Sequence, residues 1–113
     1  MRKTDKKIDN QLRATLTEVC DVLLEENNGF QWLTHSVNYS NFPKSLVITC
    51  VFDTNEQLGS FLENNNDNPL LMLVENKLNA VNISIKNVAD HVRFDTEENC
   101  RDEHSGNWAK RLG

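Results

Sequence analysis

The segment Leu46 to Phe52 constrains the fold most, because both of its alternating faces are apolar. One face carries Leu46, Ile48, Cys50 and Phe52, and the other carries Val47 and Val51. A strand that is apolar on both sides has to be covered on both, so we expect it in the middle of a sheet. Residues 31–39 also alternate, and only a short turn separates the two segments. The sequence therefore predicts an antiparallel pair with residues 46–52 in the central position.

A long amphipathic helix is predicted before this pair, over residues 5–27. Its apolar residues recur at spacings of three and four, which places them on one face: Ile8, Leu12, Leu16, Val19 and Leu23. Asn28-Gly29 supplies a left-handed stop. Basic residues stand at the start of this helix and acidic ones at its end, which opposes the helix dipole at ~0.3–1 kcal/mol for each charge. We therefore expect packing to hold this helix.

Two shorter helices and two further strands are predicted after residue 53. Thr54 and Gln57 have the spacing of a capping box. The helix that they open is expected to bury Leu58, Phe61 and Leu62. The next helix is expected to start at Pro69 after an Asn68 N-cap, with an inward face of Leu70, Leu71, Val74 and Leu78. Strands are predicted over 81–86 and 91–97, the second with Val92 and Phe94 inward and Arg93, Asp95 and Glu97 outward.

These elements predict a single α+β domain with the order α-β-β-α-α-β-β. The simplest arrangement has two layers, a mostly antiparallel sheet with the helices packed on one face. A chain of 113 residues is long enough for one domain with its own core. We expect the domain over residues 1–98 and a polar C-terminal tail over 99–113. Two alternatives are open for the tail, a short helix over residues 107–112 or partial disorder.

Charge and cysteine content narrow the function classes. The net charge is −5, so the chain lacks the overall basic footprint of a nucleic-acid-binding protein. A local basic patch remains open if the termini meet, formed by Arg2, Lys3, Lys6, Lys7, Lys110 and Arg111. No apolar run reaches the roughly 18 residues that span a membrane, and no secretory signal begins the chain. Three cysteines in unrelated patterns indicate a reducing, cytoplasmic compartment. We expect no cofactor, because the glycines are isolated and form no phosphate-binding loop.

An acidic segment near the C-terminus could hold a metal ion. Asp95 and Glu97 share one face if the chain is extended there, and His104 follows. Two such carboxylates suit a hard divalent cation, with His91 or His104 as base or third ligand. A metal-dependent hydrolase that uses residues 95–104 is therefore one hypothesis. The competing interpretation is an exposed edge strand that carries charge to prevent edge pairing.

The order α-β-β-α-α-β is similar to that of type II KH domains, which bind RNA. That resemblance implies a Gly-x-x-Gly loop between the two middle helices, where the nucleic-acid backbone is clamped. Here residues 64–68 read Asn-Asn-Asn-Asp-Asn, with no glycine and no basic residue. A nucleic-acid-binding domain remains an alternative on element order alone.

The leading hypothesis is a small non-catalytic binding or regulatory module. It would act through protein contacts, with an unknown protein partner or with a second copy as a homodimer. Aromatic residues near turns or on an outer sheet face are candidate contacts, because such residues are enriched at interfaces: Trp32, Tyr39, Phe42 and Trp108. Burial of Trp32 beneath the first helix is the alternative for that residue.

Several short segments resemble a set of short uncharacterised bacterial proteins. The resemblance is carried by residues 1–7, 92–100, 103–104 and 106–108. Members are sometimes labelled Fis-like regulators, which implies an all-helical protein with a C-terminal helix-turn-helix. The last third of this chain is instead strand-patterned and acidic and shows no recognition helix. No DNA-binding function or site residue follows from this resemblance.

Overall fold

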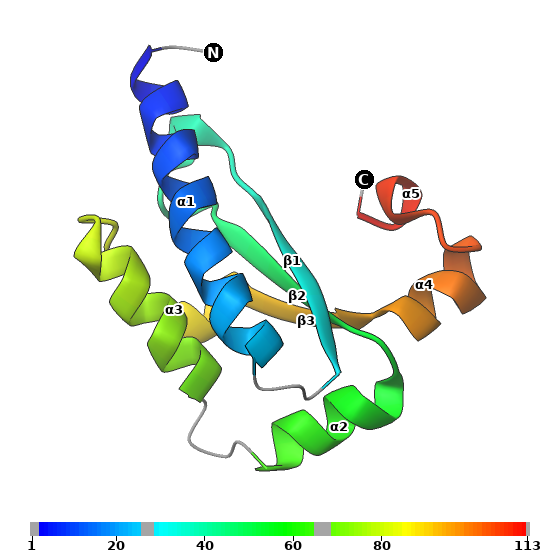
Figure 1. Cartoon of the computed structure of the whole chain (residues 1–113). Coiled ribbons are helices and arrows are strands. Elements are labelled where there is room, and N and C mark those ends of the chain that lie inside the picture. Colours follow the sequence, from blue (N-terminus) through cyan, green and yellow to red (C-terminus); the bar gives the residue numbers. More distant parts are fainter. Residues whose placement is uncertain (1–2, 26–28, 65–68, 113) are drawn as a thin grey trace.

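A three-stranded mixed sheet organises the molecule, with the strand order β1-β2-β3 (Figure 1). The strands are β1 (Phe30–Ser36), β2 (Val47–Phe52) and β3 (Val92–Thr96). This computed structural model describes residues 3–25, 29–64 and 69–112. The central strand β2 pairs antiparallel with β1 and parallel with β3. The predicted central position of residues 46–52 and their antiparallel pairing are confirmed.

Burial on both faces of β2 explains why it lies in the centre. Ile48, Cys50 and Phe52 are fully buried on the side of the long helix, and Val51 is fully buried on the other side. Phe52 is also the centre of an aromatic group, with Phe61 4.9 Å and Phe30 5.7 Å away between ring centroids. Apolar side chains on both faces of one strand thus join two parts of the core.

Helices α1 (Lys3–Glu25) and α3 (Pro69–Ala80) pack against each other on one side of the sheet (Figure 1). Of the predicted stripes, Ile8 and Leu71 are only half-buried. The others are buried: Leu12, Leu16, Val19, Leu23, Leu70, Val74 and Leu78. Helix α2 (Asn55–Asn64) lies at the end of the sheet and buries Phe61. Burial of Leu62 was a wrong prediction, since 43% of this residue is exposed. Leu62 lies about 100° round the helix from Phe61, the residue that faces the sheet.

The segment 81–86 is not a strand, although its pattern predicted one. Ile83 and Ile85 are buried, so the alternation correctly marks one inward side. However, the backbone of Ile83 donates to the carbonyl of Leu78, which folds the chain against the end of α3. Asn82 has a φ of 64°, which breaks an extended conformation. Alternating apolar and polar residues indicate that one side of a segment is buried, but they do not show that the segment pairs with another strand.

Because residues 81–86 do not form a strand, β3 is the next strand after β2, and this explains why the sheet is mixed. The chain leaves β2, passes through α2 and α3 and the short 3₁₀ turn η2 (Val88–His91), and enters β3 in the same direction. Parallel neighbours need such a long crossover, whereas β1 and β2 need only a short connection that includes η1 (Tyr39–Asn41). The expected mostly antiparallel sheet therefore has one antiparallel and one parallel pair.

Residues after Thr96 form two helices, α4 (Glu97–His104) and α5 (Trp108–Leu112). The Thr96 hydroxyl accepts the backbone N–H of Asn99 at 3.0 Å, which ends β3 and caps α4. The assignment of Glu97 to the strand was therefore wrong. Of the two alternatives for the tail, the structure shows the short helix, at Trp108–Leu112. Within the described residues, no helix has the length and apolar character needed to cross a membrane.

Candidate functional site: a groove beside the edge strand

A cleft of about 740 Å³ lies between α1 and β1. Its α1 side is lined by Asp9, Arg13, Leu16, Thr17 and Cys20. Its other side is lined by residues 33–37 of β1 and the following turn, together with Tyr39. We call this cleft the α1–β1 groove. A groove of this size between a helix and an edge strand is large enough to accept a segment of another chain.

The outer edge of β1 faces the groove. Within the described chain β1 pairs only with β2, so its other edge meets no strand. The backbone N–H of Leu33 forms a hydrogen bond with the Cys20 thiol, which shows that it points away from β2. Alternate residues of an antiparallel ladder point their backbone groups in the same direction, so His35 shares this outward orientation. Along one wall the groove therefore has an edge of β1 that meets no second strand in the described chain, although the Cys20 thiol already occupies the N–H of Leu33.

A polar cluster closes one end of the groove around Asp9. The Tyr39 hydroxyl donates to Asp9 Oδ1 at 2.7 Å, and Arg13 Nε lies 2.9 Å from Asp9 Oδ2. His35 Nε2 is 3.5 Å from Asp9 Oδ1. The side chains of Asp9 and His35 are 14% and 16% exposed, while that of Arg13 is 72% exposed. One carboxylate thus organises three neighbours at the rim.

Burial and hydrogen bonds shift the pKa values of three groups that line the groove. The hydrogen bond from Tyr39 holds the pKa of Asp9 below its ordinary value, against the opposing effect of burial. Burial and the bond to Asp9 raise the pKa of Tyr39 to about 12. Burial also raises the pKa of the Cys20 thiol. At neutral pH the groove therefore presents a carboxylate, a phenol and a thiol, and the thiol is a poor nucleophile in that form.

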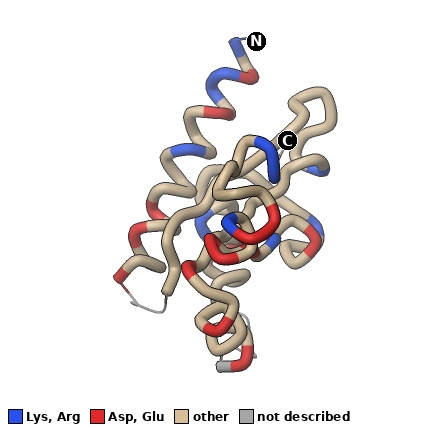
Figure 2. The backbone as a smooth tube through the Cα atoms, turned by 90° about the vertical axis from the view of Figure 1, so that its right-hand side faces the viewer, with Lys and Arg blue, Asp and Glu red and all other residues tan. Residues whose placement is uncertain are grey.

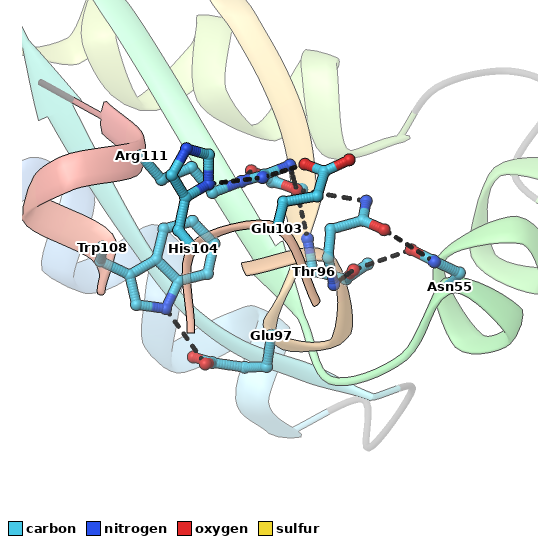
Figure 3. A network of polar contacts seen from close by, with 9 residues as sticks. Asn55, Thr96, Glu97, Glu103, His104, Trp108 and Arg111 are labelled. Atoms are coloured by element: carbon cyan, nitrogen blue, oxygen red, sulfur yellow. Dashed lines mark hydrogen bonds and ion pairs between the residues drawn. The ribbon is translucent and has the colours of Figure 1, made fainter. Parts of the chain in front are cut away.

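Trp32 and Trp108 meet on the opposite face of the sheet, where they share one carboxylate. Trp32 Nε1 donates to Glu97 Oε1 at 2.6 Å. Trp108 Nε1 donates to Glu97 Oε2 at 3.1 Å (Figure 3). The two rings are edge to face with centroids 4.8 Å apart. Both side chains are half-buried. These two of the four predicted aromatic contacts therefore join α5 to the sheet, and Trp32 is not buried beneath α1.

Arg111 organises the other predicted acidic residues. Its guanidinium forms two bonds to Asp95, of 2.6 and 3.0 Å, and a further one to Glu103 (Figure 3). Its Nη1 also lies 3.2 Å from His104 Nδ1. Burial would raise the pKa of Asp95, but the bonds from Arg111 hold it below its ordinary value. We call Asp95, Glu97, Arg111 and the two tryptophans the C-terminal clamp.

The clamp uses the residues that were predicted as metal ligands. Asp95, Glu97 and His104 do gather in one region, but Asp95 accepts from Arg111 and Glu97 from two indoles. Among residues 3–25, 29–64 and 69–112, no three or more His, Cys, Asp or Glu side chains are grouped so as to hold a metal ion. This arrangement gives the metal-dependent hydrolase hypothesis no support.

Tyr39 and Phe42, the remaining predicted contacts, lie near the groove. Tyr39 lines it, and Phe42 packs beside Tyr39 with ring centroids 6.2 Å apart. Asp9 and His35 were not among the predicted site residues, because nothing local marks a residue that a distant tyrosine will contact. The Asp9 and Arg13 spacing of four was the one available signal of a helix-surface pair.

The observations on nucleic-acid binding are limited to the described residues. The junction at 64–68 was predicted to be unsuited to clamp a nucleic-acid backbone, and residues 65–68 of it lie outside the described chain. Arg2, Asn28 and the predicted N-cap Asn68 also lie outside it. The basic residues of α1 and of α5 belong to helices that lie apart (Figure 1). Lys3, Lys6 and Lys7 therefore do not join Lys110 in one patch.

Fold and groove together define a small α+β domain whose mixed sheet leaves one edge strand open beside a helix. Comparison of the chain with models of protein families, with curated proteins and with solved structures finds no match.

Proposed function

We propose that this protein is a non-catalytic binding module that takes an extended segment of a partner protein into the α1–β1 groove. The observation that carries the proposal is the open outer edge of β1, which forms one wall of a cleft of about 740 Å³. An extended segment can add to such an edge as a further strand, with the helix as the second wall.

The sequence of β1 supports strand addition. Natural edge strands are usually protected by lysine, proline or cover from other elements. Residues 30–36 contain neither lysine nor proline, and the strand runs for seven residues. Its irregularity is a register shift between Phe30 and Trp32, at the end remote from the polar cluster. The stretch from Leu33 to Ser36 is therefore the part of β1 that is suited to pair with another strand.

The walls of the groove indicate the chemistry of the bound segment. Leu16, Leu33 and Val37 offer apolar contacts, whereas Asp9 is already bonded to Tyr39 and Arg13. A segment of about four or five extended residues, ~3.3 Å each, would match the length from Leu33 to Val37. We expect it to be uncharged at its centre, with apolar side chains at alternate positions.

Selection of random ten-residue peptides displayed on phage, followed by NMR titration of the folded protein, tests this proposal. We expect the selected peptides to shift the backbone amides of Leu33 to Ser36 and to slow their hydrogen exchange. Thr17→Trp fills the groove and should weaken binding at least tenfold. Ser60→Trp, on an exposed part of α2, is the matched control and should bind normally. Peptides that bind Thr17→Trp equally well, or that leave the β1 amides unchanged, would contradict the proposal.

A nucleic-acid-binding domain is the second candidate, because the first six elements follow the order α-β-β-α-α-β. Binding of RNA or DNA would depend on phosphate contacts and would be strongest at low salt. A gel-shift measurement at ~50 mM salt with mixed single-stranded oligonucleotides tests it. Absence of any shifted band would remove this candidate and leave the strand-addition proposal unaffected.

A further inference from the structure

The solvent-facing side of α1 is divided into a basic half and an acidic half. Opposite the buried stripe, the first half of the helix exposes Lys3, Lys6 and Lys7, and the second half exposes Glu18, Asp21 and Glu25. Figure 2 shows this division along the helix that begins at the N label, although acidic residues also occur near its start. None of these six charged residues lines the groove, whose α1 side is formed by Asp9, Arg13, Leu16, Thr17 and Cys20.

This division of charge is unfavourable for an isolated helix. The positive end of the helix dipole lies at the N-terminus, where the lysines stand, and the negative end lies beside Glu25. Within the described part of the chain the three lysines have no ion-pair partner, and of the three acids only Glu18 has one, Lys77 of α3 at 3.4 Å. Among residues 3–25, 29–64 and 69–112, no other ion pair compensates these six charges.

We propose that two copies of this chain associate through this face of α1, with the two helices antiparallel about a two-fold axis near Ala14. In that arrangement Lys7 lies opposite Asp21 of the second copy and Lys3 lies opposite its Glu25. The same contacts occur twice, because a two-fold interface pairs each patch with its own complement. The basic half of each helix then faces the acidic half of the other.

The spacing of the exposed residues fits such a pair. Positions 3, 7, 10, 14, 17, 21 and 24 alternate spacings of four and three, which keeps them along one seam between two helices. Ala14 at the centre is small, so the helix axes can approach to about 8–10 Å. Leu24 is 48% exposed at the acidic end, and the aliphatic stem of a lysine from the second copy would cover it.

The expected association is weak and sensitive to salt. Exposed ion pairs contribute little each, and the seam contains few apolar side chains. The second copy adds a further effect, because its acids lie beside the N-terminus of α1 and its lysines beside the C-terminus. Both helix ends therefore gain the charges that the dipole favours. Asp9, Arg13, Leu16 and Cys20 lie on the groove side of α1, whereas Thr17 belongs to both the groove and the seam, so the second copy borders the groove at Thr17.

Two double variants and their mixture test the inference. Lys3→Glu/Lys7→Glu makes the seam uniformly acidic, and Asp21→Lys/Glu25→Lys makes it uniformly basic. We expect the wild type to sediment as a monomer–dimer equilibrium at 20 mM salt and as a monomer at 500 mM salt. Each double variant alone should be monomeric at 20 mM salt, with a dissociation constant raised at least tenfold. An equimolar mixture of the two should form a heterodimer tighter than the wild-type dimer.

The double variants should weaken the dimer without lowering the stability of the monomer. This outcome distinguishes loss of the interface from damage to the fold. Each double variant corrects the charge at one end of α1, so the melting temperature of the monomer should rise or stay equal. Lys44→Glu/Lys86→Glu changes the net charge as Lys3→Glu/Lys7→Glu does, but at exposed positions elsewhere, and should leave the wild-type equilibrium unchanged. A wild type that stays monomeric at millimolar concentration and 20 mM salt overturns the inference. Double variants that still self-associate overturn it equally, because the contact must then use another face.

Discussion

Two clefts of similar volume flank β1, and they use their charges differently. Thr34, His35 and Ser36 line both clefts, but the α1–β1 groove adds Leu33 and Val37. The other cleft, of about 720 Å³, reaches α5 instead. In the groove the cation at the rim, Arg13, is 72% exposed. In the other cleft Arg111 is only 15% exposed and bonds two carboxylates.

The two clefts differ in whether their charged side chains join elements of the fold to one another. Arg111 and Glu97 tie α5 and α4 to the sheet, and both use their bonding capacity on residues of the same chain. The groove has one polar cluster at its end and an open strand edge along its wall. Charge in the clamp therefore holds the short helix α5 to the sheet, whereas the edge of β1 in the groove meets no second strand in the described chain.

The largest expected effect comes from Arg111→Met. This change leaves the half-buried carboxylate of Asp95 without its cation, and loss of one partner of a buried pair costs ~3–5 kcal/mol. Because Arg111 and Asp95 retain 15% and 16% exposure, we expect a smaller loss of about 2 kcal/mol. Urea unfolding measures it, and Lys110→Met on the exposed side of α5 should change the free energy by less than about 0.5 kcal/mol.

The pH dependence of the same variant provides an independent check. In the wild type the pKa of Asp95 is lowered, so its contribution to stability is present above its unfolded pKa of about 3.9 and is lost as pH falls through the lower folded value. In Arg111→Met burial would dominate and raise this pKa. The stability difference from wild type should therefore shrink on acidification from pH 7 to pH 4. A difference that stays constant with pH would show that Arg111 acts only by packing.

The second effect in size comes from Glu97→Gln. Glutamine keeps one acceptor oxygen but places an NH₂ group towards one of the two indole N–H groups, so one indole loses its partner. We expect a loss of about 1–2 kcal/mol, as for a half-buried donor left unsatisfied. Tryptophan fluorescence should shift to longer wavelength as Trp108 becomes more exposed, and Glu56→Gln on the exposed side of α2 should leave both measurements unchanged. Unaltered fluorescence would mean that Glu97 does not hold Trp32 and Trp108 in place.

The sequence predicted elements whose cause is local. The Thr54 hydroxyl accepts the backbone N–H of Gln57, at the spacing that predicted a helix start there. Asn38 and Asn107 make local contacts of the same kind, with the backbone N–H groups of Ser40 and Lys110. These features depend on one residue and its neighbours along the chain, so they can be recognised without the fold.

The groove and the clamp could not be predicted in the same way. Trp32 and Glu97 are 65 residues apart, and Tyr39 and Asp9 are 30 apart, so each bond depends on how the elements pack. The acidic segment 95–104 was predicted as a possible metal site because its residue types suit a cation. The structure supplies that cation from Arg111, which stands in the tail predicted to be polar or partly disordered.

The smallest expected effect comes from Tyr39→Phe, in the groove. The variant loses the 2.7 Å bond to Asp9, but Arg13 still contacts the carboxylate and water can reach the rim, so we expect a loss of only about 0.5 kcal/mol. The pKa of Asp9 should rise towards its ordinary value, because the bond from Tyr39 is the main cause of its lowering. Carboxyl NMR titration measures this change, with Ser40→Ala as the control at an exposed neighbouring position. A stability loss as large as that of Arg111→Met would contradict the distinction between the two clefts, since the polar cluster of the groove would then hold the fold as the clamp does.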